Sequence, residues 1–297
     1  MEFLDVVKII LIGIIEGITE WLPISSTGHM IIFQNLWEKF FGGFWSPIFS
    51  SGFPDVFDYV IQFGAILAVV VVFWNKIFPF GLSKKHSDNG KLLVGGIAVK
   101  KDVLSMWLKV IVACIPAVLA IVADELFENI KGDAEIILIS SMLILYGVGF
   151  IVVESINKKK TPKVEGIENL SYLYAFLIGC FQVLASIPGT SRSGVTIIGA
   201  LILGVSRITA AEFTFFLAIP TMVGASGFKM LKFILDGGAF SMTEIWALLL
   251  GMVVAFAVSM MAIKLLMSFV RKHDFKPFGW YRIILGLVLI SVCIVLP

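Results

Sequence analysis

Long apolar segments alternate with short polar connections along most of the chain. An α-helix needs about 20 predominantly apolar residues to cross a bilayer, and we assign six segments as transmembrane spans. They are residues 56–74, 103–122, 136–153, 213–235, 245–267 and 283–297. The pattern predicts an all-α polytopic membrane protein with six transmembrane helices.

Two other regions, 3–41 and 172–204, each contain a pair of shorter apolar segments separated by a polar tip. The tips are residues 23–29 in the first region and 188–193 in the second. Non-helical backbone is tolerated at membrane depth only where protein or a water-filled cavity covers it. We therefore expect two re-entrant helical hairpins whose tips are buried within the protein.

The composition agrees with a membrane protein and excludes other classes. Hydrophobic residues make up 59% of the 297-residue chain and charged residues 15%, with a mean hydropathy of +0.99. These values lie outside the range of soluble globular proteins, and a net charge of +2 gives no basis for nucleic-acid binding. Cys114, Cys180 and Cys293 lie in apolar runs, so we expect buried thiols rather than disulfides or metal ligands.

The charges of the loops predict the orientation in the membrane. Loops 75–102, 154–171 and 268–282 are rich in Lys and Arg, which places them in the cytoplasm. Loop 123–135 is acidic and loop 236–244 has no Lys or Arg, so both face outside. The charges assigned to loop 268–282 are Arg271, Lys272, Lys276 and Arg282. The first hairpin then enters and leaves through the outer face, and the second through the cytoplasmic face.

The same assignment contains an inverted-topology repeat within a single membrane domain, residues 1–297. Repeat one, residues 1–153, is a hairpin followed by three spans, and repeat two, residues 172–297, has the same order. Because three spans is an odd number, the two repeats have opposite topology.

Short motifs support the repeat. Residues 13–16 and 25–28 align without a gap to residues 179–182 and 191–194. The alignment pairs Glu16 with Gln182, Glu20 with Ser186, and Ser26 with Arg192. Inverted repeats place their site where the two interrupted elements meet, near the middle of the bilayer. We therefore expect the two polar tips to face each other.

The second tip has the features of an anion-binding site. Glycine lets the backbone approach a ligand, hydroxyls donate hydrogen bonds, and the following helix presents unpaired N–H groups at its N-terminus. Arg192 adds a planar guanidinium suited to phosphate. The residues expected to bind phosphate are Gly189, Thr190, Ser191, Arg192 and Ser193. The alternative is a polar turn in which Arg192 only neutralises a glutamate.

The first tip supplies complementary chemistry. His29 follows Ser26 by three residues, close enough across a tight turn for a base to meet a nucleophile. Glu16 and Glu20 share one helix face and, with phosphate oxygens, suit a hard divalent cation such as magnesium or calcium. The alternative is a protonated or arginine-paired couple of carboxyl groups. Further candidates for phosphate binding are Ser25 and Thr27.

Polar residues outside the two tips are weaker candidates for a functional role. Gln62, in the span 56–74, either faces the cavity and contacts phosphate or bonds to a neighbouring helix. Arg207 and Glu212 are expected to pair at the membrane interface, and their nearness to the second hairpin leaves a substrate role open.

At the two tips the sequence resembles the bacterial undecaprenyl-diphosphate phosphatase family, which is known for conferring bacitracin resistance. The matching stretches are EGITEWLPISSTGH, residues 16–29, and PGTSRSG, residues 188–194. The resemblance implies a multi-pass hydrolase of the bacterial cell membrane that removes one phosphate from undecaprenyl diphosphate. Its product is the lipid carrier for peptidoglycan and other wall polymers.

The resemblance also implies roles for individual residues. It suggests a dependence on a divalent metal, with Glu16 and Glu20 serving metal binding and catalysis, and a site open to the outer face. His29 and Ser26 would serve the attack, and Arg192 would bind the diphosphate. The spacing leaves open whether Ser26, His29 or water is the nucleophile, and whether magnesium or calcium is used.

Two rival functions fit parts of the pattern. A lipid flippase or other transporter would also use inverted repeats with interrupted helices, although transport needs neither a nucleophile and base nor an anion cradle. A type 2 phosphatidic acid phosphatase is disfavoured, because its second motif follows the arginine with a histidine and an aspartate that residues 193–205 lack. The oligomeric state is open, with a homodimer as one alternative.

Overall fold

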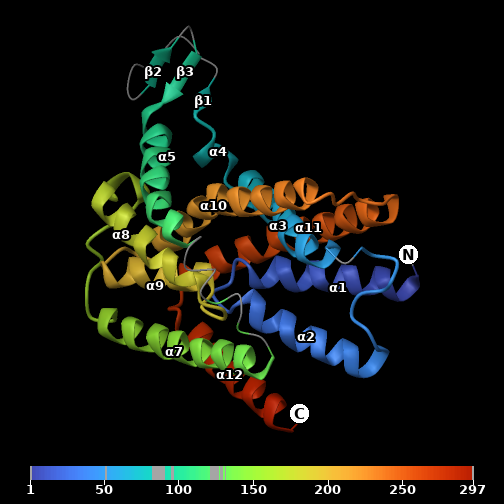
Figure 1. Ribbon diagram of the computed structural model, residues 1–297. Helices are drawn as coiled ribbons and strands as arrows, with labels where there is room; N and C mark the ends of the chain where they lie inside the picture. The colour runs from blue at the N-terminus through green and yellow to red at the C-terminus, as the bar shows by residue number, and fades with distance from the viewer. Residues whose placement is uncertain are drawn as a thin grey trace.

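The computed structural model describes residues 2–295 apart from 51, 82–90, 95–96, 121–126, 128–129 and 131. It is mainly α-helical (Figure 1). The helices are α1 Phe3–Thr19, α2 Ser26–Phe41, α3 Phe53–Val72, α4 Trp74–Ile77, α5 Lys101–Cys114, α7 Asp133–Asn157, α8 Tyr172–Val183, α9 Arg192–Ile202, α10 Arg207–Leu235, α11 Met242–Val270 and α12 Lys276–Val295. Three short 3₁₀ turns are η1 Ile115–Ala117, η2 Ile167–Asn169 and η3 Leu184–Ser186.

A small sheet interrupts the otherwise helical architecture. Its strands are β1 Phe80–Gly81, β2 Lys91–Val94 and β3 Ile97–Lys100. Both neighbouring pairs are antiparallel, in the order β1-β3-β2. The sheet projects beyond the start of α5, away from the helical body (Figure 1). The expected basic loop 75–102 therefore contains regular structure that hydropathy did not reveal.

Five of the six predicted spans are confirmed as helices long and apolar enough to cross a membrane. They are Phe53–Val72, Lys101–Ala120, Asp133–Asn157, Arg207–Leu235 and Met242–Val270. The sixth predicted span, 283–297, begins within α12, which ends at Val295, and its side chains beyond Ser291 lie outside the described residues. Together these helices make the chain a multi-pass membrane protein.

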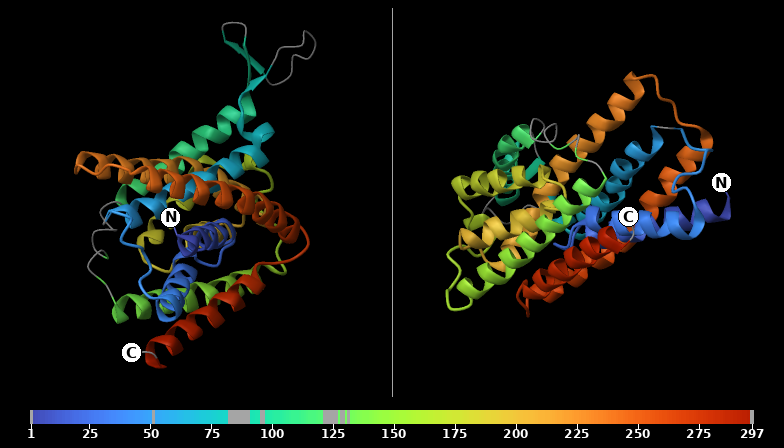
Figure 2. Two further views of the ribbon diagram at one scale, coloured as in Figure 1. Left: turned by 90° about the vertical axis from the view of Figure 1, so that its right-hand side faces the viewer. Right: turned by 60° about the horizontal axis from the view of Figure 1, so that its bottom comes forward.

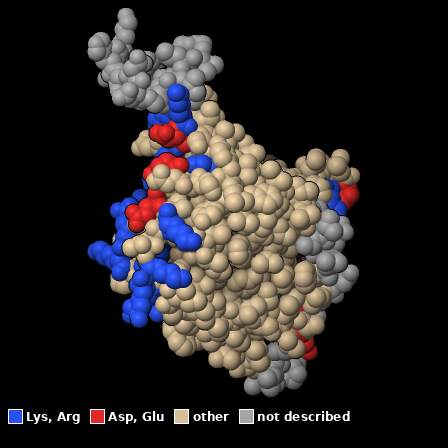
Figure 3. Space-filling model, turned by 90° about the vertical axis from the view of Figure 1, so that its left-hand side faces the viewer, with Lys and Arg blue, Asp and Glu red and all other residues tan. Residues whose placement is uncertain are grey.

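The distribution of charged side chains on the surface agrees with a membrane environment. The middle of the face shown in Figure 3 has no charged side chains, whereas Lys and Arg, together with some Asp and Glu, gather along one edge. Exposed basic residues lie just after α7 and between α11 and α12: Lys158, Lys159, Lys160, Lys163, Arg271 and Lys272. A broad uncharged band bordered by charged side chains is the pattern expected where lipid tails give way to the polar surface of a membrane.

Two pairs of shorter helices approach each other inside the bundle. Helices α1 and α2 extend toward the centre from one side and α8 and α9 from the other (Figure 1). The long helices surround them: α1 packs on α11, α8 on α5, α3 on α10 and α11, and α7 lies along α12 (Figure 2). The polar turns after α1 and α8 therefore lie at the centre of the molecule.

The two turns have the same local geometry. Ser25 and Ser191 are the two described non-glycine residues with a positive φ, 73° and 67°. Each is the N-cap of the following helix, and its hydroxyl accepts a hydrogen bond from the backbone N–H of Gly28 or Gly194. Because positive φ is costly for serine, its occurrence at both aligned positions reflects one motif used twice.

A large apolar core fixes the first turn in place. Trp21, 1% exposed, packs edge-to-face on Phe215 of α10, with ring centroids 5.3 Å apart. The surrounding core combines residues of α3, α5, α8, α9, α10 and α11. The indole ring therefore anchors the turn after α1 to a helix of the other half of the chain.

Several sequence predictions are wrong in detail. Arg282 is completely buried in α12 instead of lying in a loop. Arg207 pairs with Glu154, and Glu212 pairs with Lys76, so Arg207 and Glu212 do not pair with each other. These partners come from other elements that fold against α10, which spacing along one helix cannot reveal.

The cysteine prediction is also only partly correct. Cys114 and Cys180 are free thiols, but Cys180 is exposed because it lies on the face of α8 that turns away from its helical neighbours. The side chain of Cys293 and most of the acidic loop 123–135, including Asp124, Glu125 and Glu128, lie outside the described residues.

Close helix packing yields a first prediction. A Cβ atom on Gly64 of α3 would lie 2.2 Å from the carbonyl oxygen of Met252 in α11. Gly64→Ala should therefore destabilise the protein by about 1–3 kcal/mol, measured as a lower melting temperature in detergent. The matched control is Gly224→Ala in α10, where nothing lies within 4 Å of the new methyl group. Equal melting temperatures for the two variants would contradict the packing.

Candidate functional site

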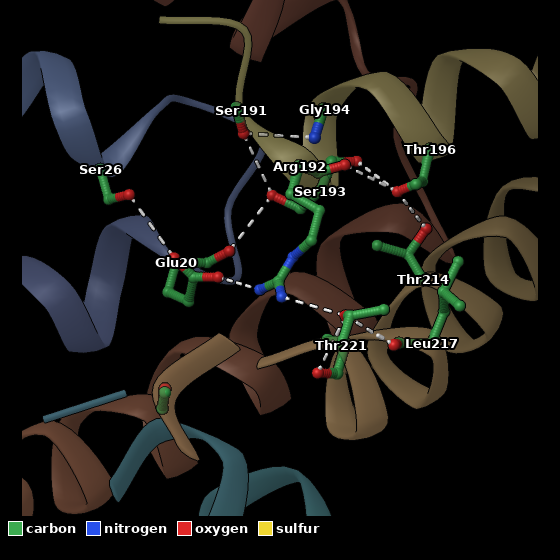
Figure 4. Close-up of polar contacts among 12 residues, drawn as sticks. Glu20, Ser26, Ser191, Arg192, Ser193, Gly194, Thr196, Thr214, Leu217 and Thr221 are labelled. Atoms are coloured by element: carbon green, nitrogen blue, oxygen red, sulfur yellow. Dashed lines mark hydrogen bonds and ion pairs between the residues drawn. The ribbon is translucent and has the colours of Figure 1, made fainter. Parts of the chain in front are cut away.

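The two central turns meet through an ion pair and a hydrogen bond. The guanidinium of Arg192, at the start of α9, binds the carboxylate of Glu20, which follows α1 (Figure 4). The Ser193 hydroxyl donates to the backbone oxygen of Glu20 at 3.2 Å. Both charged side chains are mostly buried, 20% exposed for Arg192 and 10% for Glu20. Residues far apart in the sequence thus form one polar centre.

Hydroxyl groups complete the surroundings of this ion pair. The Ser26 hydroxyl donates to the second carboxylate oxygen of Glu20 at 3.5 Å (Figure 4). The Arg192 guanidinium also donates to the Thr221 hydroxyl of α10 at 3.3 Å. Sequence reasoning missed Thr221, although its position directly after Pro220 inside a long span marked an irregular point of the helix.

The second turn presents the start of α9 to the centre. The Ser191 hydroxyl accepts from the Gly194 N–H and lies 3.3 Å from the Ser193 hydroxyl. Gly189 has φ +87°, and a Cβ there would lie 2.7 Å from backbone atoms of Ile139. Only glycine fits this conformation and space. The helix N-terminus beside Arg192 has the free N–H groups and the dipole that favour a bound anion.

The remaining residues predicted to bind phosphate differ in burial and in hydrogen bonding. Ser25 and Thr190 are buried, whereas Thr27 is exposed in the first turn of α2. Gln62 is half-buried in α3 and makes no hydrogen bond among the described residues. The structure therefore brings Ser25, Thr190, Ser191 and Ser193 to the two turns but gives Thr27 and Gln62 no polar contact there.

The His29 imidazole makes no hydrogen bond to Ser26 among the described residues. Its Nδ1 lies 2.7 Å from the Ser25 carbonyl oxygen, and its Nε2 lies 2.7 Å from the Tyr281 hydroxyl of α12. The two rings stack with centroids 5.6 Å apart. Among the described contacts the partner of the Ser26 hydroxyl is Glu20. The expected pairing of Ser26 with His29 is therefore not the arrangement that the chain adopts.

Arg282 ties both turns to α12. It is 0% exposed and donates to the carbonyl oxygens of Gly189 at 3.0 Å and Thr190 at 2.7 Å. A longer contact of 3.5 Å reaches the Pro23 carbonyl of the first turn. Sequence reasoning missed this role because Arg282 lies close to a basic loop. A signal was its position within an apolar run that already forms α12.

A buried group of carboxyl side chains lies beside the ion pair. Glu16 is 4% exposed, and its Oε1 atom has no hydrogen-bond partner among the described residues. It interacts electrostatically with Glu20 and with Asp58 of α3, whose Oδ1 atom is also buried without a partner. Sequence reasoning missed Asp58, which precedes Gln62 by one helical turn.

These carboxyl groups fit a hard cation in part. Carboxylate oxygens are the ligands that magnesium and calcium prefer, and the unpartnered Glu16 oxygen needs a cation or a proton. Within the described part of the chain, no three His, Cys, Asp or Glu side chains are grouped to hold a metal ion by themselves. Glu16 and Glu20 could hold a cation that takes its other ligands from phosphate and water.

Comparison with known proteins gives a consistent result. The model of the family described as bacitracin resistance protein BacA matches residues 9–288. The chain is 52% identical over 293 residues to an undecaprenyl-diphosphatase of Enterococcus faecalis, covering 98% of each chain. It is also similar to undecaprenyl-diphosphatases of Acetivibrio thermocellus, at 50% identity, and Lachnoclostridium phytofermentans, at 48%, with 97% of each chain covered in both cases.

The burial of Arg282 yields a second prediction. Arg282→Gln should lower the free energy of unfolding by on the order of 3 kcal/mol, because it removes donors from the carbonyl oxygens of two buried residues, Gly189 and Thr190. Thermal unfolding in detergent measures the change. Arg271→Gln, the same substitution at an exposed position, is the control and should unfold like the wild type. An unchanged melting temperature for Arg282→Gln would contradict the conclusion that Arg282 holds the two turns against α12.

Proposed function

The chain belongs to the bacitracin resistance protein BacA family, and we propose that it is an undecaprenyl-diphosphate phosphatase. It hydrolyses undecaprenyl diphosphate to undecaprenyl phosphate and inorganic phosphate, which regenerates the carrier for cell-wall synthesis and underlies bacitracin resistance. The observation that carries the proposal is the meeting of Arg192, Glu20 and Ser26 at two buried turns. The flippase alternative has no support, since the relatives are named as diphosphatases.

Binding of the diphosphate follows from the chemistry of the second turn. Arg192 offers a fork of N–H donors, and Ser191 and Ser193 add hydroxyl donors next to the N-terminus of α9. In the absence of substrate, Arg192 binds Glu20. When the diphosphate binds, the guanidinium turns to the phosphate oxygens, so the Glu20 carboxylate is released for proton transfer.

The attack follows from the contact between Ser26 and Glu20. The Ser26 oxygen attacks the terminal phosphorus while its proton passes to Glu20, and undecaprenyl phosphate leaves. Water then hydrolyses the phosphoserine, which releases phosphate and restores the hydroxyl. Glu16 and Glu20 would hold magnesium or calcium, and the bound cation would neutralise negative charge on the phosphate oxygens.

The finer topology is part of the proposal. Six transmembrane helices and two re-entrant hairpins, α1–α2 and α8–α9, form inverted repeats over residues 1–153 and 172–297. Support comes from the matched caps at Ser25 and Ser191, and from glycines at aligned places in α1 and α8. A Cβ on Gly13 would lie 3.0 Å from the Gly251 oxygen of α11, and one on Gly179 would lie 2.1 Å from the Ala113 oxygen of α5.

The proposed environment is the bacterial cell membrane, with the site open to the outer face. The first hairpin enters from that face in the loop-charge assignment, and the lipid tail of the substrate lies along apolar helix surfaces. Exposed apolar side chains on α7, α8 and α12 give such surfaces within the bilayer. A homodimer stays an untested alternative to a monomer.

The proposed activity yields a third prediction. The purified protein should release phosphate from undecaprenyl diphosphate in detergent, where no transmembrane gradient exists. Arg192→Ala should lower kcat/KM about a thousandfold, because it removes the main positive charge that stabilises the phosphoryl group in transfer. Arg271→Ala, at an exposed position outside the site, should behave like the wild type. Release of phosphate at equal rates by all three proteins would remove Arg192 from the site.

The carboxyl pair yields a fourth prediction. A chelator should abolish phosphate release, and added magnesium or calcium should restore it. Glu16→Gln should raise the cation concentration needed for half-maximal rate by at least about tenfold, because a charged ligand is lost. The control is Glu38→Gln, an exposed carboxylate on α2, which should leave the cation dependence unchanged. Turnover that persists in chelator would contradict the metal assignment.

A further inference from the structure

Tyr281 contacts the proposed site although its side chain reaches the surface. It lies in the second turn of α12 and is 44% exposed. Its hydroxyl lies 2.7 Å from Nε2 of His29, and its ring is parallel to the imidazole within 6°. A phenylalanine would provide the same ring, so packing alone does not explain the hydroxyl group.

The hydrogen bonds of His29 determine which ring nitrogen carries the proton. The Ser25 carbonyl oxygen, 2.7 Å from Nδ1, can only accept a hydrogen bond, so Nδ1 carries hydrogen. In the neutral imidazole Nε2 is then an acceptor, and the Tyr281 hydroxyl must donate to it. The tyrosine therefore stabilises one tautomer and one orientation of the ring.

This contact continues to the proposed nucleophile. Ser25, which accepts from His29, is the strained N-cap of α2 with φ 73° and immediately precedes Ser26. The next residue of α12, Arg282, binds the carbonyl oxygens of both turns. Two successive residues of α12 thus stabilise the two central turns. Arg282 donates to backbone carbonyl oxygens of both turns, and Tyr281 donates to the imidazole of His29.

We propose that Tyr281 is a positioning residue of the phosphatase, acting through His29. Its hydroxyl keeps the proton of the neutral imidazole on Nδ1, and Nδ1 holds the Ser25 carbonyl so that Ser26 stays aligned with Glu20. Tyr281 itself does not touch the phosphate. The inference rests on the proposed function, because alignment of Ser26 matters only if that hydroxyl reacts.

The test compares Tyr281→Phe with the wild type in the full-length protein. The variant keeps the stacked ring and loses only the hydroxyl. With undecaprenyl diphosphate as substrate, kcat should fall about tenfold while KM stays within about twofold, since substrate contacts are unchanged. In protein labelled with ¹⁵N-histidine, the Nε2 signal of His29 should shift in the variant. His29→Gln identifies that signal among the three histidines.

A matched control distinguishes the loss of the Tyr281 hydroxyl contact from a general effect of a tyrosine-to-phenylalanine change on folding. Tyr172→Phe makes the same change at an exposed tyrosine of α8 and should alter neither kcat nor the His29 signal. A Tyr281→Phe protein with wild-type kcat, or with an unshifted His29 signal, would overturn the inference while leaving the phosphatase activity intact. Absence of phosphate release by the wild-type protein would contradict the proposed function itself.

Discussion

A charged side chain within a bilayer must be neutralised by an opposite charge or a proton, or be hydrated by water. Arg192, at the start of α9, and Glu20, directly after α1, neutralise each other. Neither residue could stay ionised at membrane depth without the other or a ligand. The pair therefore forces the turn after α1 and the turn before α9 to the same place. In the proposed function the same two side chains would bind the diphosphate and activate the attacking hydroxyl. The contact that holds the two turns together is therefore also the one that the proposed phosphatase reaction uses.

The remaining polar groups at the centre hold the two turns in a fixed conformation. Ser25 and Ser191 cap the following helices from a conformation that serine rarely adopts, and Gly189 fits where a side chain would clash with Ile139. Arg282 supplies donors to carbonyl oxygens that no helix satisfies. Turns of this kind are tolerated within a membrane protein only where the surrounding protein covers them and supplies hydrogen-bond partners to their backbone.

The sequence predicted features that depend on local pattern. Hydropathy located five membrane-spanning helices, and the gapless alignment of the two tips anticipated the matched caps at Ser25 and Ser191. Partners set by tertiary packing were not predictable. Arg282 looked like part of a basic loop because a single arginine near a charged segment carries no sign of burial. The pairing of Arg207 with Glu154, and of His29 with Tyr281, likewise joins residues far apart in sequence.

Glu20 and Arg192 bind each other directly where the two turns meet. A double-mutant cycle on thermal unfolding tests this contact most directly, with Glu20→Gln, Arg192→Gln and the double variant in the same detergent. Each single change leaves one buried charge without its partner, so the double variant should be no less stable than the worse single variant, with a coupling energy of about 1–3 kcal/mol. Strictly additive losses would contradict direct contact.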